Sequence, residues 1–158
     1  MDRLIKFHED PIFYDVINNE NIKSLKNQLQ SHSNIYEMNY AILYHGTSRK
    51  NPVLEQGLLP TSNNRKKSLQ STNGYVYLSI FPSMAKNFGE IAYPNQDISV
   101  YEVKVLMKNL IADTDQLRNK RMWGNVVCGN SLAESLLIGH GARVKGKIDL
   151  WQIKEYQQ

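Results

Sequence analysis

Hydrophobic and polar residues alternate most clearly over residues 98–107. There Val103 and Val105 alternate with Glu102 and Lys104. A period of two is typical of a β-strand that buries one face and leaves the other in water. We therefore predict a half-buried strand over this stretch.

Four further stretches have strand character. Residues 41–45 form an apolar run that ends in a histidine, and the glycine and hydroxyl residues at 46–48 predict a turn after it. Residues 74–79 are rich in β-branched and aromatic side chains, which favour strands. Residues 134–138 and 148–153 are also largely apolar, and we predict a strand in each.

Helical patterns occupy three other stretches. Ile22, Leu25 and Leu29 recur at a spacing of three and four, and the asparagines just before them are suitable N-cap residues. Residues 51–56 and 82–89 each carry a proline near their start and have a glycine at or just after their end. Both features mark the limits of short helices.

Polar connections separate these elements. Residues 60–73 and 113–131 lack a clear period, and we predict a loop in each. Short strands mixed with a few helices indicate an α+β fold. We expect a helical accessory segment over residues 1–38 and a single domain over residues 39–158.

Composition limits the class of protein further. A chain of 158 residues, with 41% hydrophobic and 22% charged residues, is typical of one globular domain. The net charge of +4 favours an acidic or nucleic partner only slightly. Cys128 is the one cysteine, which excludes a disulfide framework. The polar first twenty residues and the lack of a long apolar run predict a cytoplasmic protein without a membrane span.

Several common motifs are absent from the sequence. It contains no P-loop, no dinucleotide-binding glycine fingerprint and no G-x-S-x-G element. The four histidines are far apart and have no companion cysteines, so no metal site is expected. Three candidates for chemistry remain: His45 at the end of a strand, a tyrosine within residues 74–79, and Glu134 at the start of an apolar run.

The order histidine, tyrosine, glutamate resembles the ADP-ribosyltransferase superfamily, on the branch of diphtheria-toxin-like enzymes and poly-ADP-ribose polymerases. Residues 44–48 (YHGTS) look like the first motif of that family. Residues 74–79 (GYVYLS), with the helix predicted at 82–89, look like the second. The resemblance covers about residues 41–153 and leaves residues 1–38 outside it.

Three positions for the functional carboxylate stay open, in two regions of the chain. Glu134 leads an apolar run, as the family glutamate does. Leu132 stands two residues before it, where arginine-modifying members carry a second acidic residue. The region after residue 113 is also similar to the small rifamycin-modifying members, in which an aspartate near Asp113 or Asp115 is important.

The resemblance implies a split β-sandwich of short strands with a few flanking helices. It also implies an NAD-dependent ADP-ribosyltransferase of bacterial or phage type, a toxin or effector, with NAD as co-substrate and a macromolecular acceptor. Alternatives on the same fold are an NAD glycohydrolase, an enzyme like the RNA 2′-phosphotransferases, and an inactive binding or inhibitor module. The acceptor itself stays open between protein, nucleic acid and small molecule.

The first motif implies contacts to both ends of NAD. His45 is expected to form a hydrogen bond with the adenosine ribose. The backbone of Gly46 is expected to bond to the nicotinamide amide, since a glycine lets a ligand approach closely. Thr47 belongs to the same motif and is expected in the cofactor site. Three basic residues are candidates for the pyrophosphate: Arg49, Lys50 and Arg65.

The second and third motifs imply the residues around the bond that breaks. Tyr77 is expected to stack on the nicotinamide ring, and Tyr75 shares its facing because strand side chains alternate. Ser79 is expected to support the same pocket. Glu134 is expected to bond the ribose hydroxyl and to offset the positive charge of an oxocarbenium-like transition state.

Overall fold

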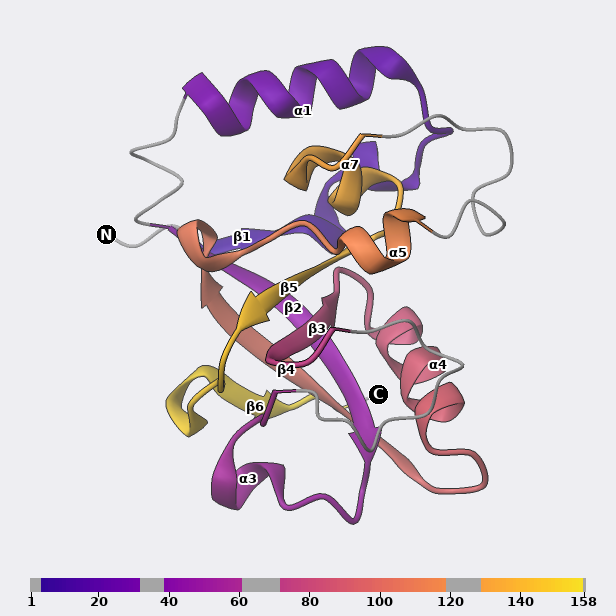
Figure 1. Ribbon diagram of the computed structural model, residues 1–158, viewed down its shortest axis with the longest axis vertical. Coiled ribbons are helices and arrows are strands. Elements are labelled where there is room, and N and C mark those ends of the chain that lie inside the picture. The colour runs from indigo at the N-terminus through magenta and orange to yellow at the C-terminus, as the bar shows by residue number, and fades with distance from the viewer. Residues whose placement is uncertain (1–3, 32–38, 61–71, 119–128, 158) are drawn as a thin grey trace.

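The computed structural model describes residues 4–31, 39–60, 72–118 and 129–157, and it is an α+β fold built on one six-stranded sheet (Figure 1). The α+β prediction is confirmed. The strands are ordered β5-β3-β2-β4-β6, with β1 paired to β2, and every pair except β1–β2 is antiparallel. The strands are β1 (Leu4–Lys6), β2 (Tyr40–Ser48), β3 (Tyr75–Ser79), β4 (Ile98–Leu106), β5 (Gly141–Lys145) and β6 (Ile153–Glu155).

The helices lie mostly at the two ends and along one side of this sheet (Figure 1). They are α1 (Asn19–Ser31), α3 (Val53–Gln56), α4 (Pro82–Ala92), α5 (Thr114–Arg118) and α7 (Leu132–Leu137). Short 3₁₀ turns complete the secondary structure: η1 (Phe7–Glu9), η2 (Pro11–Tyr14), η3 (Met107–Asn109) and η4 (Leu150–Gln152). In the part of the chain that the structure describes, no helix combines the length and the apolar character needed to cross a membrane.

Buried side chains form a core on each face of the sheet. The larger core joins Leu43 and Val103 of the sheet to Leu136 of α7 and to Leu25 of α1. The smaller one packs α4 against the opposite face, where Ala85 meets Ile42, Tyr44 and Val100. The N-terminal residues contribute to the larger core, because Phe7 and Phe13 are buried in it. β1 also adds a parallel strand to β2.

The strand and helix predictions for the middle of the chain hold, with three main changes in length. The helix α3 begins at Val53 and not at residue 51. The strand β2 continues through Ser48 in place of the turn predicted at 46–48, because its pairing with β4 runs as far as Ser48 and Ile98. The helix α4 continues past Gly89 to Ala92. A Cβ at Gly89 would lie 2.7 Å from Cγ2 of Ile98, so this glycine permits close packing and does not end the helix.

Three predictions for the second half of the chain are wrong. Residues 134–138 were expected to form a strand, but Leu132–Leu137 is the helix α7, which begins after the N-cap Ser131. The final strand is Ile153–Glu155 and not residues 148–153, since a 3₁₀ turn precedes it. The polar connection predicted at 113–131 contains α5, and its residues 119–128 lie outside the described part of the chain, as do residues 61–71.

The sheet is almost divided between β2 and β3. These neighbouring strands share one register pair, Tyr44 with Ser79, whereas β2 and β4 share nine. On one side of this opening lies the group β1, β2, β4 and β6, and on the other lies the pair β3 and β5.

Candidate functional site

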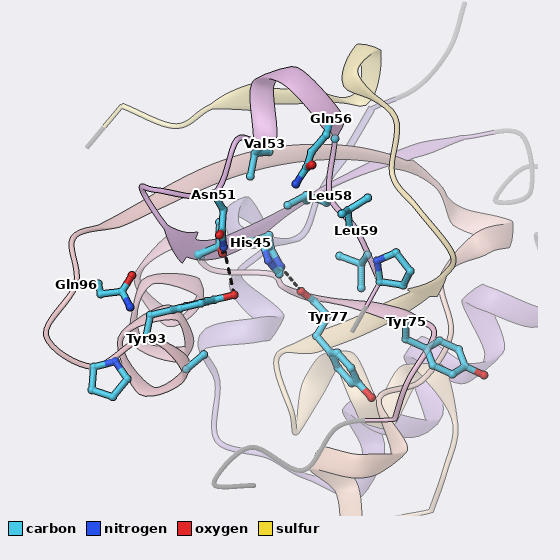
Figure 2. A pocket seen from close by; sticks show the side chains of 17 residues that line it. His45, Asn51, Val53, Gln56, Leu58, Leu59, Tyr75, Tyr77, Tyr93 and Gln96 are labelled. Atoms are coloured by element: carbon cyan, nitrogen blue, oxygen red, sulfur yellow. Dashed lines mark hydrogen bonds between the residues drawn. The ribbon is translucent and has the colours of Figure 1, made fainter. Parts of the chain in front are cut away.

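A pocket of about 570 Å³ lies where β2 and β3 separate (Figure 2). The register pair of Tyr44 with Ser79 would place Gly46 opposite Tyr77 if the antiparallel ladder continued, but no such pair forms. The described lining consists of His45, Gly46, Thr47, Asn51, Val53, Gln56, Gly57, Leu58, Leu59, Pro60, Tyr75, Val76, Tyr77, Ala92, Tyr93, Pro94 and Gln96. The pocket volume lies within the ordinary range for small-molecule sites.

The backbone of Gly46 points towards this opening. Gly46 is the register partner of Val100 on β4, and the Val100 carbonyl accepts a bond from the N–H of Tyr156 on the other side of β4. Residues of an antiparallel strand alternate between pairing with one neighbour and with the other. The N–H and C=O of Gly46 are therefore directed away from β4, towards β3.

The same alternation directs the backbone of Tyr77 towards β2. Ile80 donates its N–H to the carbonyl of His140, so the alternate residues Ser79 and Tyr77 face away from β5. The carbonyl oxygen of Tyr77 lies 2.7 Å from Nδ1 of His45. A carbonyl can only accept, so Nδ1 carries the proton, and a neutral imidazole then holds its lone pair on Nε2.

Tyr77 presents its ring to the pocket, and a buried polar cluster holds its hydroxyl group. The hydroxyl donates to Asp115, accepts the N–H of Thr72 at 2.6 Å and lies 3.4 Å from Nη1 of Arg143. The pKa of Tyr77 is raised, first because the phenol is buried and then because it donates to the Asp115 carboxylate. The ring is thereby fixed in place as a phenol.

Asp115 is held by its own ion pair. Nη1 of Arg143 lies 3.1 Å from Oδ2 of Asp115, and Thr72 Oγ1 lies 3.0 Å from the same oxygen. The Arg143 guanidinium also sits 4.3 Å from the centre of the Tyr75 ring. These residues form a continuous cluster, which we call the Tyr77–Asp115–Arg143 cluster.

Asp113 belongs to the structural framework beside this cluster. Its N–H donates to Ser135 Oγ at 2.8 Å, and its Oδ1 accepts the N–H of Gln116. Burial raises the pKa of Asp113 to about 6. Its carboxyl group is not among the described residues that line the pocket.

Glu134 is not among the described residues that line the pocket. Its carboxylate accepts bonds from Ser131 Oγ at 2.7 Å and from the N–H of Gly129, and it pairs with Nζ of Lys26 on α1 at 2.8 Å. Burial alone would raise the pKa of Glu134, but Lys26, Ser131 and Gly129 together lower it. The residue therefore joins α7 to α1.

The other predicted residues divide between the pocket and the framework. Thr47 and Tyr75 line the pocket, whereas Ser79 is buried at the single β2–β3 pair and does not line it. A Cβ at Gly46 would collide with the backbone carbonyl of Ala85 in α4. The close approach of α4 therefore requires a glycine here, which is a reason that the sequence did not reveal.

Polar residues at the far end of the pocket were not predicted. Nδ2 of Asn51 donates to Thr47 Oγ1 at 2.7 Å and to the Tyr93 hydroxyl at 3.2 Å (Figure 2). Gln96 accepts a bond from the Ser48 hydroxyl. Asn51 falls in the helix predicted at 51–56, whereas Tyr93 falls in none of the predicted elements, and no local pattern marks them as partners.

The described lining is nearly uncharged. It holds no aspartate, glutamate, lysine or arginine, and His45 is its only histidine. Arg49 donates through Nε to Ser99 Oγ at 3.3 Å, neither Arg49 nor Lys50 lines the pocket, and Arg65 lies outside the described residues. Such a site suits a planar, polar group that bonds to a strand edge.

No protein-family model matches the chain, and no curated protein is similar enough to it to count as a match.

Proposed function

We propose that this protein is an NAD-dependent ADP-ribosyltransferase whose site is the pocket between β2 and β3. One observation carries the proposal: the ladder stops where Gly46 and Tyr77 would pair, and a pocket takes its place. A carboxamide has one acceptor oxygen and a donor NH₂ group, so it can bond to the C=O and N–H of a strand residue. The nicotinamide carboxamide is therefore a suitable partner for Gly46.

The residues beside Gly46 suit the rest of a nicotinamide riboside. The flat ring of Tyr77 offers a stacking surface to a planar cation. His45 stands at the same opening, with Nδ1 held by the Tyr77 carbonyl, which fixes the orientation of its ring. The near division of the sheet also supports the split architecture that the family resemblance implies.

Asp115 is our preferred functional carboxylate, in place of Glu134. It bonds to the hydroxyl of Tyr77, whereas Glu134 is held by Lys26 and Ser131 at α7. This choice follows the similarity to the small rifamycin-modifying members. NAD supplies an ADP-ribosyl group, whose bond to nicotinamide breaks as a bond to the acceptor nucleophile forms and the acceptor loses a proton. Negative charge near that ribose stabilises the positive charge that develops.

The test compares Asp115→Asn with Glu134→Gln. Nicotinamide release from NAD is followed by chromatography, and NAD binding is followed by thermal shift. We expect Asp115→Asn to lower turnover by about 10²–10³ while the NAD-induced shift persists, because an electrostatic group is lost. Glu134→Gln should retain turnover at a temperature where the variant is folded. The reverse pattern would assign the chemistry to Glu134.

A second candidate function is a binding module that holds NAD without turning it over. It is favoured because Asp115 is already neutralised by Arg143, and because the described lining carries no acidic residue. Stabilisation by NAD without nicotinamide release, in the presence of protein, DNA and RNA pools, would support this candidate. Absence of any stabilisation at millimolar NAD would contradict both candidates.

A further inference from the structure

A second hollow, of about 310 Å³, lies beside β5 and carries a concentration of positive charge. The backbone pairing between Leu58 and Ile148 separates it from the first pocket, because Leu58 lines one and Ile148 the other. We call it the lysine hollow. Its described lining is Val105, Lys108, Asn109, Ile111, Val144, Lys145, Lys147, Ile148 and Gln152.

Three lysines from two segments of the chain line this hollow. Lys108 lies in η3, Lys145 is the last residue of β5, and Lys147 follows in the loop to η4. All three are exposed. The described lining contains no carboxylate, and the neighbouring Asp149 uses its side chain to cap η4. Three like charges around one hollow repel each other and attract an anion.

Aliphatic residues lie beneath the lysine hollow, and among those described only Ile111 is substantially exposed. Val105, Val144 and Ile148 are buried, and Ile111 is 39% exposed. One wall is rigid, because Gln152 donates Nε2 to the Lys104 carbonyl and accepts the N–H of Asp149 through Oε1. A fitting ligand therefore combines anionic groups with a flat group that can lie against Ile111.

We propose that the lysine hollow binds single-stranded nucleic acid. The lysines neutralise successive phosphates, and an unstacked base lies against the exposed side chain of Ile111. A duplex keeps its bases stacked and cannot offer one to Ile111, whereas a single strand can turn a base outwards. The volume is at the lower end of the range for ligand sites, which suits one nucleotide unit.

The lysine hollow lies next to the first pocket. Tyr75 and Val76 line the pocket, and their register partners Lys145 and Val144 line the hollow. Paired strands lie about 4.8 Å apart. A bound strand would therefore pass close to the pocket, and it would be a candidate acceptor, a role that rests on the proposed function. The binding itself does not depend on NAD.

The experiment measures binding by the fluorescence anisotropy of labelled oligothymidylate and oligouridylate, each twelve nucleotides long. The titrations are made without NAD at a series of salt concentrations. Contacts with about three phosphates predict that log K falls against log salt with a slope of about −2 for a single strand. Lys108→Gln, Lys145→Gln and Lys147→Gln should each weaken binding several-fold and reduce the slope by about 0.7. Lys23→Gln, at an exposed position on α1, removes the same charge elsewhere and should change neither quantity.

Other outcomes would overturn the assignment. Equal or tighter binding of a duplex would contradict the single-strand geometry. Equal binding of polyglutamate would mean that the hollow attracts any polyanion and has no preference for nucleic acid. Loss of affinity in Lys23→Gln to the same extent would also contradict it. NAD stabilisation is measured separately on the same variants, so failure here is distinguishable from failure of the proposed function.

Discussion

Gly46 lies between the pocket and the helix α4, and substituting it tests which of the two requires a glycine. Its backbone faces the pocket, while a Cβ at this position would strike the carbonyl of Ala85 in α4. Backbone atoms cannot rotate away as a side chain can, so we expect Gly46→Ala to destabilise the fold by about 3 kcal/mol. Urea unfolding measures this change.

Gly146→Ala is the matched control for that measurement. Gly146 has a φ of +83°, and a Cβ there meets nothing within 4 Å. The free energy of unfolding of this variant should fall only by the conformational cost of a positive φ, about 1–2 kcal/mol. If Gly46→Ala costs no more than Gly146→Ala, the close approach of α4 to β2 does not determine the need for glycine.

The buried carboxyl of Asp113 should make stability depend on pH. Burial raises its pKa to about 6 from an ordinary value near 3.8. Between these values the folded protein binds more protons than the unfolded chain, so this residue makes stability fall as pH rises from about 4 to 6. The decrease amounts to about 3 kcal/mol.

Asp113→Asn tests this directly, because asparagine keeps the acceptor for the Gln116 N–H and cannot ionise. We expect the variant to match the unmodified protein near pH 4 and to be the more stable of the two at pH 7. Unfolding in urea at pH 4, 5, 6 and 7 gives the comparison. A difference that is the same at every pH would show that Asp113 is not the titrating group.

At the scale of elements, Ser131 determines where α7 begins. Its Oγ accepts the N–H of Glu134 and donates to the Glu134 carboxylate, which in turn reaches Lys26 of α1. Ser131→Ala should remove the cap and loosen this link, at a cost of about 1–2 kcal/mol. Ser131→Thr keeps the hydroxyl and should recover most of the loss in urea unfolding.

The same Ser131 variants test whether α7 belongs to the structural framework or to the binding site. Because Glu134 lies outside the described pocket lining, Ser131→Ala should leave the affinity for NAD unchanged while the protein is folded. Isothermal titration at 15 °C measures that affinity. A large loss of NAD affinity in Ser131→Ala, recovered in Ser131→Thr, would instead place α7 in the binding site.

The sequence revealed elements with a clear local period and missed those defined by distant partners. Residues 98–107 alternate strongly, and the strand β4 is there. The apolar run after Glu134 was too short to distinguish a strand from a buried helix by period alone, although Ser131 and Glu134 have the spacing of a helix cap. The strand β5 was missed, since it is short, begins with glycine and depends on pairing with β3.

The sequence likewise predicted some residues of the candidate site and left others undecided or unrecognised. His45, Gly46 and Tyr77 belong to local motifs, and the structure brings them to one pocket. Asp115 remained one of three candidate carboxylates, because its bond to Tyr77 joins residues 38 positions apart. Nothing in a linear pattern reports such a bond, and the same holds for Asn51 and Tyr93.

Across the whole molecule, the near division of the sheet predicts how a ligand should act. Between β2 and β3 the described residues share only the pair Tyr44–Ser79, supplemented by the bond from His45 to the Tyr77 carbonyl. A ligand that bonds to Gly46 and packs on Tyr77 would join the two parts of the sheet. Local opening at this seam should then become rarer when NAD binds.

Amide hydrogen exchange followed by NMR tests this for single residues. Saturating NAD should slow exchange at the Gly46 amide by at least tenfold, since that N–H faces the seam. The Leu43 amide is the internal reference, because Leu43 belongs to the alternate set of residues that pair with β4. Equal slowing at both amides would mean that NAD stabilises the whole fold without closing the seam. Slowing at neither would mean that the opening between β2 and β3 does not hold the dinucleotide.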